Sequence, residues 1–183
     1  MDSTQLRTRL LALLRERAFR EGDFTLASGK KSNYYIDGRM IAVCPEGAWL
    51  IGEALVEQLQ DVECNAIGGL AVGAVPIVTA TMVACHRHGR PMEGFWVREK
   101  PKEHGMQKQI EGKLPENPQV VIVDDVITSG GSSLKAAEAV EAAGGKVVLM
   151  AAIVDRQQGA AELFASRGYP YRPLFVKDEL FQK

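Results

Sequence analysis

The chain has 183 residues, of which 46% are apolar and 25% charged, and its formal net charge is −1. This is the make-up of an ordinary soluble protein of one domain, with room for a small subdomain. A charge so close to zero gives no global attraction to nucleic acid or anionic lipid, and no apolar run approaches the ~20 residues of a membrane span, so neither partner is expected.

The first part of the chain predicts two helices around a turn-rich stretch. The opening helix follows an Asp2–Gln5 pair that fits a capping box, and its apolar face is marked by Leu6, Leu10, Leu13 and Leu14. The polar stretch 21–40 holds two short apolar pieces, 24–26 and 34–36, which fit small strands or a hairpin. A second helix is marked by Ala48, Ile51, Leu55 and Leu59.

From residue 64 onward, strand and helix patterns alternate. Strands are predicted at 64–68, 94–97, 120–123, 146–154 and 171–176, and helices from near Pro76, over 134–143 and over 160–167. The strands are continuously apolar, which indicates burial on both faces of a parallel sheet with right-handed crossovers. The predicted fold class is therefore α/β, a parallel sheet flanked by helices, whose ligands bind beyond the carboxyl ends of the strands.

A few residues indicate the cellular environment or the burial of a side chain rather than a reaction. The cysteines Cys44, Cys64 and Cys85 match no zinc or redox spacing, so we expect reduced, packed thiols in a cytoplasmic protein. The N-terminal residues carry polar side chains at every turn, unlike a signal peptide. The pair His86 and His88 predicts a solvated helix end rather than a metal site. The tryptophans, Trp49 and Trp96, fall on periodic apolar positions and are predicted to lie in the core.

The most informative stretch is 120–133, with the sequence VVIVDDVITSGGSS. A buried strand brings Asp124 and Asp125 to its carboxyl end, and a loop of small residues, 128–132, runs into a helix. Backbone N–H groups in such a loop, with a helix N-terminus behind them, form an anion site. Gly130 and Gly131 permit close approach and positive φ, and the loop hydroxyls add donors.

The two carboxylates narrow the kind of ligand that this segment can bind. They would repel a bare nucleotide phosphate, but ionised carboxylates are strong acceptors for sugar hydroxyls. The segment therefore predicts a ribose diol on the carboxylates and its 5′-phosphate on the loop. The alternative, a plain strand-to-helix turn with an acidic end, leaves the adjacent acids and the small polar residues unexplained.

The same segment resembles the phosphoribosyl pyrophosphate signature of the type I phosphoribosyltransferases. That signature has four apolar residues, two acids, two apolar residues and then Thr-Ser/Ala-Gly-Gly/Thr. Neither a Walker A motif nor a G-x-G-x-x-G run is present to compete with it. The resemblance implies contacts between phosphoribosyl pyrophosphate and Asp124, Asp125, Val126, Ile127, Thr128, Ser129, Gly130, Gly131 and Ser132.

A stretch of about 20 residues without an obvious element follows Val97, and so long a stretch is usually functional. Taken alone, its charges are those of a solvated loop. Their order resembles the catalytic loop of orotate phosphoribosyltransferases, Arg-x-x-x-Lys-x-His-Gly. The resemblance implies that Arg98, Lys102 and His104 are catalytic and stabilise a leaving pyrophosphate. Gly105 and Gly112 could serve as hinges of a mobile loop.

Three other segments are similar to that family. Residues 24–37 resemble its N-terminal hood, which implies that Tyr34 and Tyr35 lie near the base. Residues 68–76 are similar to its pyrophosphate-side loop. Residues 154–157 resemble the segment whose arginine faces the orotate carboxylate, and the planar fork of Arg156 suits that partner. Together with Thr128, these residues form the implied orotate site.

The chain departs from the family at two positions. Some members carry lysine where Ala27 and Val72 stand, and Lys30 or Lys31 could substitute. These departures bear on contacts and affinity more than on the reaction.

The resemblance implies an assembly as well as a reaction. We expect one phosphoribosyltransferase domain over 1–183, with a hood over approximately 1–40 and a core over approximately 41–183. Its substrates would be orotate and phosphoribosyl pyrophosphate. Mg²⁺ would be held largely by the substrate, and no protein side chain is predicted as its ligand. The family's homodimer implies that the loop 98–112 acts in the neighbouring subunit.

Two alternatives remain open. The chain could transfer phosphoribosyl groups to a purine or another base, although Arg156 and the loop beginning at Arg98 argue against this. It could also be a regulatory module that senses phosphoribosyl pyrophosphate while binding RNA or DNA. The net charge of −1 offers that module little support.

Overall fold

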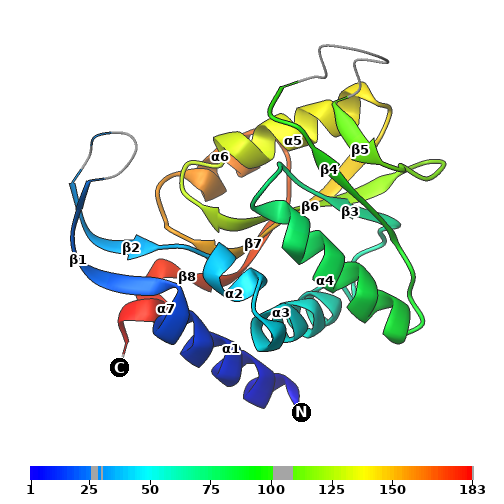
Figure 1. Ribbon diagram of the computed structural model, residues 1–183. Helices are drawn as coiled ribbons and strands as arrows, with labels where there is room; N and C mark the ends of the chain where they lie inside the picture. The colour runs from blue at the N-terminus through cyan, green and yellow to red at the C-terminus, as the bar shows by residue number, and fades with distance from the viewer. Residues whose placement is uncertain (26–28, 30, 101–108, 183) are drawn as a thin grey trace.

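The computed structural model describes residues 1–25, 29, 31–100 and 109–182 (Figure 1). Its elements are α1 (Ser3–Arg17), β1 (Phe19–Thr25), β2 (Lys31–Ile36), α2 (Arg39–Ala42), α3 (Pro45–Gln58), β3 (Ala66–Gly68), α4 (Ala74–Arg87), β4 (Glu93–Val97), β5 (Ile110–Gly112), β6 (Gln119–Ile127), α5 (Gly131–Ala142), β7 (Lys146–Asp155), α6 (Ala160–Ser166), β8 (Tyr171–Val176) and α7 (Lys177–Phe181). Among these residues, the main sheet has six strands in the order β5-β4-β3-β6-β7-β8, and β1 pairs with β2 in a separate antiparallel sheet.

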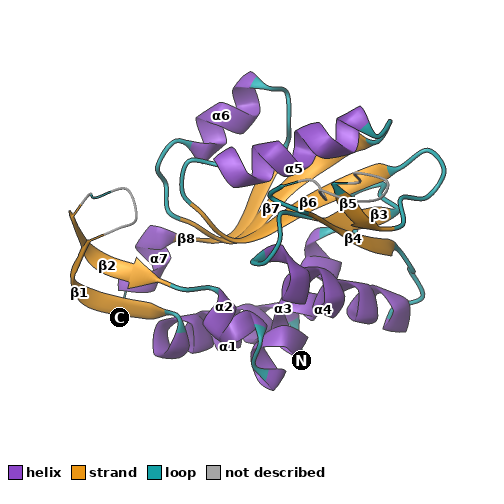
Figure 2. Cartoon of the chain, turned by 45° about the horizontal axis from the view of Figure 1, so that its top comes forward, coloured by secondary structure: helices purple, strands orange, loops and turns teal. Residues whose placement is uncertain are grey.

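The main sheet is covered by helices on both faces. Figure 2 shows α5 and α6 on one face and α1, α3 and α4 on the other. Strands β3, β4, β6, β7 and β8 run parallel, and β5 lies antiparallel to β4 at the edge. The predicted α/β class is confirmed, with an antiparallel edge strand that the sequence pattern did not indicate.

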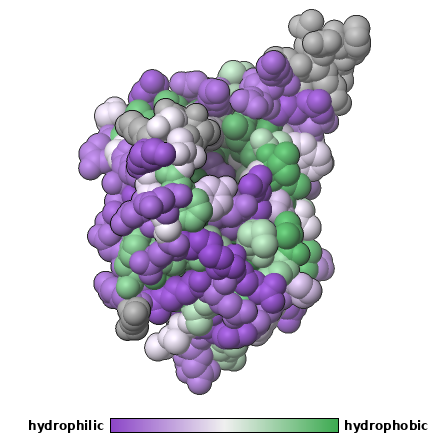
Figure 3. All heavy atoms as spheres, turned by 60° about the vertical axis from the view of Figure 1, so that its left-hand side comes forward, coloured by the Kyte–Doolittle hydropathy of each residue, from purple (hydrophilic) through white to green (hydrophobic). Residues whose placement is uncertain are grey.

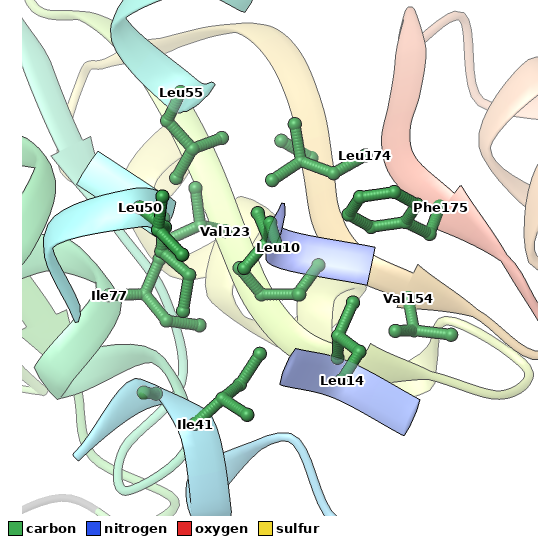
Figure 4. Packing of buried hydrophobic residues seen from close by; sticks show 14 of the residues in the cluster. Leu10, Leu14, Ile41, Leu50, Leu55, Ile77, Val123, Val154, Leu174 and Phe175 are labelled. Carbon is green, nitrogen blue, oxygen red and sulfur yellow. The ribbon is translucent and has the colours of Figure 1, made fainter. Parts of the chain in front are cut away.

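The two faces of the sheet explain why its strands are continuously apolar. Along β6, Val121 and Val123 point into the cluster under α1, α3 and α4, whereas Val120 and Ile122 point into the cluster under α5 and α6. Figure 4 shows the first cluster, in which Leu10 of α1 packs among residues of α3, β6 and β8. Helix α1 is thus part of the core, and the β1–β2 hairpin projects beside it.

The capping box predicted at the start of α1 is present. The Asp2 carboxylate accepts from the Gln5 backbone N–H at 2.8 Å, and the Gln5 side chain accepts from the Asp2 N–H at 3.2 Å. Two backbone N–H groups at the start of the helix, which have no acceptor within the helix, are thereby hydrogen-bonded. None of Cys44, Cys64 and Cys85 forms a disulfide. Among the described residues, no helix has the length and apolar character needed to cross a membrane.

Two parts of the sheet differ from the sequence prediction. Strand β6 does not end at Val123 but continues through Asp124 and Asp125 to Ile127, where it still pairs with β7. The carboxylates interrupt the apolar run without interrupting the backbone ladder. Within the stretch predicted to lack an element, β5 pairs with β4, and Gly112 lies opposite Phe95 in that pairing. A Cβ on Gly112 would lie 2.7 Å from the carbonyl oxygen of Gly94.

Both tryptophan predictions were wrong. Trp49 is 43% exposed and Trp96 is 39% exposed. In α3, the neighbours Leu50 and Ile51 face the core, so Trp49 lies on the outer side of the helix. In β4, the alternation of strand side chains buries Phe95 and turns Trp96 to the opposite face, which the helices cover incompletely.

A candidate phosphoribosyl-transfer site

A cavity lies where the chain connections diverge from the middle of the sheet. Strand β3 leads through α4 to β4 on one side, and its neighbour β6 leads through α5 to β7 on the other. Ligands of open α/β sheets bind at such a point. The cavity has a volume of about 330 Å³ and is lined by Tyr35, Ile36, Asp37, Arg39, Leu70, Ala71, Gly73, Asp124, Asp125, Val126, Thr128, Ser132 and Arg156.

A second hollow adjoins the first. It has a volume of about 320 Å³ and is lined by Asp124, Val126, Ile127, Thr128, Ser129, Gly130, Gly131, Ser132, Ser133 and Lys135. Four lining residues are shared by the two spaces: Asp124, Val126, Thr128 and Ser132. All nine residues predicted to contact the phosphoribosyl group therefore line one hollow or the other, and Asp124 stands where the hollows meet.

The two aspartates are held by close packing of glycine loops. Asp125 donates its backbone N–H to the Asp124 carboxylate at 3.0 Å, and the buried Ser133 hydroxyl donates to the same carboxylate at 3.3 Å. A Cβ on Gly38 would lie 2.8 Å from the Cβ of Asp125, and one on Gly73 would lie 2.8 Å from its carboxylate oxygen. Side chains at these two glycines would fill the space in which the carboxylates face the cavity.

Burial changes the acidity of Asp124. Desolvation, and then the charge of Asp125, raise the pKa of Asp124 to about 7. Ionisation of this carboxyl group is therefore less favourable than usual when no ligand donates hydrogen bonds to it. Hydroxyl donors from a sugar would stabilise the ionised form, as the predicted ribose contact requires.

This raised pKa predicts a pH-dependent stability. Between the ordinary carboxyl pKa of about 4 and the raised value, the folded protein binds a proton that the unfolded chain has released. The free energy of unfolding therefore falls as the pH rises through this range. Asp124→Asn removes this titration, so the melting temperature of the variant relative to the unliganded wild type should increase from about pH 4 to about pH 8. Differential scanning fluorimetry measures the difference, and Asp23→Asn, on an exposed strand, is the matched control.

The loop after β6 has the features of an anion site. Gly130 has φ +83°, and a Cβ there would lie 2.7 Å from the Phe164 ring, so glycine is required. Gly131 was also expected to have positive φ, but it begins α5 with helical geometry. Helix α5 has no side-chain cap, so its first N–H groups face the hollow without an internal acceptor. Lys135, one turn into α5, adds a cation that sequence reasoning missed.

Arg156, which follows β7, also lines the first cavity. The turn after β7 is fixed by the Gln157 N–H, which donates to the Asp155 carboxylate at 2.7 Å, and by the Arg156 N–H, which donates to the Ile127 carbonyl at 2.9 Å. Arg156 is only 8% exposed. Its Nη2 is buried and has no hydrogen-bond partner among the residues that the structure describes. A buried guanidinium N–H without an acceptor is costly unless a ligand provides one.

The two hood tyrosines have different positions. Tyr35 lines the cavity and is 40% exposed. Tyr34 is 7% exposed, is absent from the cavity lining, and accepts a hydrogen bond from the Nε of Arg156 at 3.2 Å. The sequence pattern could not separate the two, because adjacent residues of β2 point to opposite sides of the hairpin.

An ion pair at the cavity edge was also missed. Arg39 contacts Asp37 through its Nε at 2.8 Å and its Nη2 at 2.9 Å. The hydrogen bonds from Arg39 lower the pKa of Asp37. Asp37 stood at the end of the family-like segment, but no pattern indicated that Arg39 would reach back to pair with it.

The three predicted catalytic residues are only partly placed. Arg98 follows β4, donates to Glu111 at 3.3 Å, and does not line the cavity. Its backbone N–H donates to the Gln109 carbonyl at 2.9 Å, which extends the β4–β5 pairing by one step. Lys102 and His104 lie outside the described residues, so their predicted roles are not tested.

The carboxylate oxygen atoms in the cavity suit a Mg²⁺ ion that arrives bound to the substrate better than one bound by protein side chains alone. Among the residues that the structure describes, no three His, Cys, Asp or Glu side chains form a group that could bind a metal. Asp124 and Asp125 supply oxygen atoms, which suit Mg²⁺, but two adjacent carboxylates leave most of its coordination to water or substrate.

Comparisons with known proteins agree with this geometry. The model of the phosphoribosyl transferase domain family matches residues 67–166. The orotate phosphoribosyltransferase of Bradyrhizobium diazoefficiens is 42% identical over 187 residues, covering 100% of both chains. Crystal structures of the Mycobacterium tuberculosis H37Rv orotate phosphoribosyltransferase, in complex with Fe(III) dicitrate and with 5-phospho-α-D-ribosyl 1-diphosphate, give TM-scores of 0.86 and 0.82. Their identities are 38% and 34%, and each covers 97% of this chain and 99% of the other.

Proposed function

This chain belongs to the orotate phosphoribosyltransferase family, and we propose that the cavity between β3 and β6 is where it performs that family's reaction. The enzyme transfers the phosphoribosyl group from phosphoribosyl pyrophosphate to orotate, giving orotidine 5′-phosphate and pyrophosphate in pyrimidine nucleotide synthesis. One observation carries the assignment of the site. Two carboxylates, a loop with the features of an anion site and a buried guanidinium together line two hollows that share four residues.

Each group of lining residues suits one part of the reactants. The Thr128–Ser132 loop and the start of α5 would bind the 5′-phosphate. Asp124 and Asp125 would accept from the ribose hydroxyls and fix the sugar between the two hollows. The unpartnered Nη2 of Arg156 would donate to the orotate carboxylate, with Thr128 and Tyr35 beside the base.

The reaction then needs positioning more than a protein nucleophile. The bond from the anomeric carbon to pyrophosphate breaks as a ring nitrogen of orotate forms its bond to the same carbon, and that nitrogen releases its proton to solvent or to the departing pyrophosphate. Holding both reactants in one cavity favours this displacement. Arg98, Lys102 and His104 would stabilise the negative charge that develops on pyrophosphate. Bound Mg²⁺ would neutralise pyrophosphate oxygens, while Asp124 and Asp125 hold the sugar hydroxyls beside it.

A homodimer is part of this proposal, with the loop 98–112 of one subunit acting at the site of the other. The support is an apolar surface beside the cavity. A hollow of about 430 Å³ lies between α3 and α4 and includes the exposed Trp49 and Val83. Val72, which is 75% exposed, belongs to the same loop as the cavity residues Leu70 and Ala71, and this loop leads into α4.

This apolar surface, defined by Val72, Trp49 and Val83, is best filled by a second copy of the chain. Contiguous exposed apolar groups mark interaction sites. A copy seated there would stand at the rim of the cavity, where a loop from that copy is needed. Figure 3 shows that hydrophilic side chains dominate the face turned towards the viewer, with hydrophobic ones gathered towards one edge. A cytoplasmic location, in keeping with the unpaired cysteines, completes the proposal.

The test of the function is an orotate absorbance assay with phosphoribosyl pyrophosphate and Mg²⁺. Consumption of orotate that depends on both additions is expected. A parallel panel of purine bases separates orotate from other acceptors, and use of a purine in place of orotate would overturn the assignment. Binding of phosphoribosyl pyrophosphate without any transfer would instead favour a regulatory module.

A further inference from the structure

The Arg156 guanidinium is held from one side by a residue that does not line the cavity. The hydroxyl of Tyr34 accepts from the Nε of Arg156 at 3.2 Å and from the Nε2 of Gln158 at 3.4 Å. The guanidinium carbon of Arg156 also lies 4.8 Å from the centre of the Tyr34 ring. These contacts occupy one edge and one face of the guanidinium and leave Nη2 without a partner.

Tyr34 is in turn fixed by an aromatic cluster that joins both ends of the chain. Its ring lies 5.4 Å from that of Phe181 in an edge-on arrangement and 6.2 Å from that of Phe19. Phe19 and Phe181 are themselves 4.8 Å apart, also edge-on. Figures 1 and 2 both show α7, which carries Phe181, beside the β1–β2 hairpin that carries the other two.

Helix α7 is anchored to α1 by two arginines. Arg15 donates to the backbone carbonyl of Glu179 at 2.6 Å. Arg7 forms an ion pair with the Glu179 side chain and donates to the Leu174 carbonyl at 2.5 Å. Phe181 therefore rests on a docked helix, and the position of its ring is set by the core of the protein.

We propose that Tyr34 is a positioning residue for orotate, and that Phe181 of the C-terminal helix supports it in that role. The inference rests on the proposed contact between Arg156 and the orotate carboxylate. A long side chain loses rotamer freedom when it binds, and a site that fixes the side chain beforehand reduces this cost. Tyr34 fixes Nε and the plane of the guanidinium before the base arrives.

The matched substitution is Tyr34→Phe, which keeps the ring and removes only the acceptor. The KM for orotate should rise about tenfold, the loss expected for one charge-assisted hydrogen bond. The kcat and the KM for phosphoribosyl pyrophosphate should stay within about twofold, since the sugar site is untouched. Phe181→Leu should shift the KM for orotate in the same direction. Tyr169→Phe removes a hydroxyl that bonds to Glu141, away from the cavity, and is the control.

A double-mutant cycle with Arg156→Met separates positioning from general loss of structure. If Tyr34 acts through Arg156, Tyr34→Phe should add little further loss in the Arg156→Met background. Full additivity, or an equal rise in both KM values, would overturn the inference. If Arg156→Met itself leaves orotate use unchanged, the proposed role of Arg156 fails. If Arg156→Met impairs orotate use but Tyr34→Phe and Phe181→Leu do not, only the positioning role fails.

Discussion

Replacement of Arg156 by methionine should lower kcat/KM for orotate by about 10²-fold or more, with little change in the binding of phosphoribosyl pyrophosphate. Methionine keeps much of the side-chain volume but donates no hydrogen bond. Arg156 is buried, it lines the cavity, and its Nη2 has no hydrogen-bond partner among the described residues. In the variant, the orotate carboxylate would have neither the positive charge nor the N–H donors of Arg156. Steady-state kinetics with each substrate varied in turn measure the two effects separately.

Two further variants sharpen this test. Arg156→Lys keeps the charge without the planar fork and should recover only part of the loss. Arg172→Met removes a surface arginine that pairs with Asp61 at 2.7 Å, and it should leave both KM values unchanged. Near-normal kcat/KM for orotate in Arg156→Met would show that the base binds elsewhere.

Mixing two inactive variants should restore activity if the site is shared between subunits. Lys102→Ala and Asp125→Asn are each expected to be nearly inactive. In a heterodimer, Asp125 of one chain would meet Lys102 of the other, and one of the two sites would be intact. Random pairing makes half of the dimers heterodimers, so recovery of about a quarter of wild-type activity is expected after the two are unfolded and refolded together.

The apolar surface provides the control for this complementation. Val83→Glu, made in both chains, places a charge in the hollow between α3 and α4 and should prevent both dimerisation and recovery. Sedimentation velocity reports the assembly, and the far-UV circular dichroism spectrum reports whether the monomer remains folded. Verified heterodimers that recover no activity would place the loop 98–112 in the site of its own chain.

The sequence predicted the core of the fold because its strands are buried on both faces. Continuous apolar runs such as 120–123 leave few alternatives to a helix-covered parallel sheet. The segment 120–133 also predicted the carboxylates and the anion loop, because strand, acids and glycines follow one another without a gap. The residues of this part of the site are neighbours in the sequence, so their arrangement could be predicted without knowing any distant contact.

Features that depend on distant contacts could not be predicted in this way. Strand β5 has only three residues, and it forms because β4 offers an edge. The exposure of Trp49 depends on which side of α3 meets α1 and α4. The burial of Tyr34 depends on Phe181, near the opposite end of the chain. No periodicity in a single segment contains that information.

The division of the proposed contacts between two parts of the chain has a consequence for the evolution of base preference. The sugar and phosphate groups would contact one continuous segment, from Asp124 to Ser132. The base would contact Thr128 of that segment, but otherwise Arg156 and the hairpin, whose Tyr34 packs against Phe181 of the C-terminal helix. Mutations in the hairpin, at the end of β7 or in α7 could therefore change the accepted base while the sugar-binding segment stays intact. New acceptor specificities can then arise in small steps, each from a protein that still binds the same activated sugar.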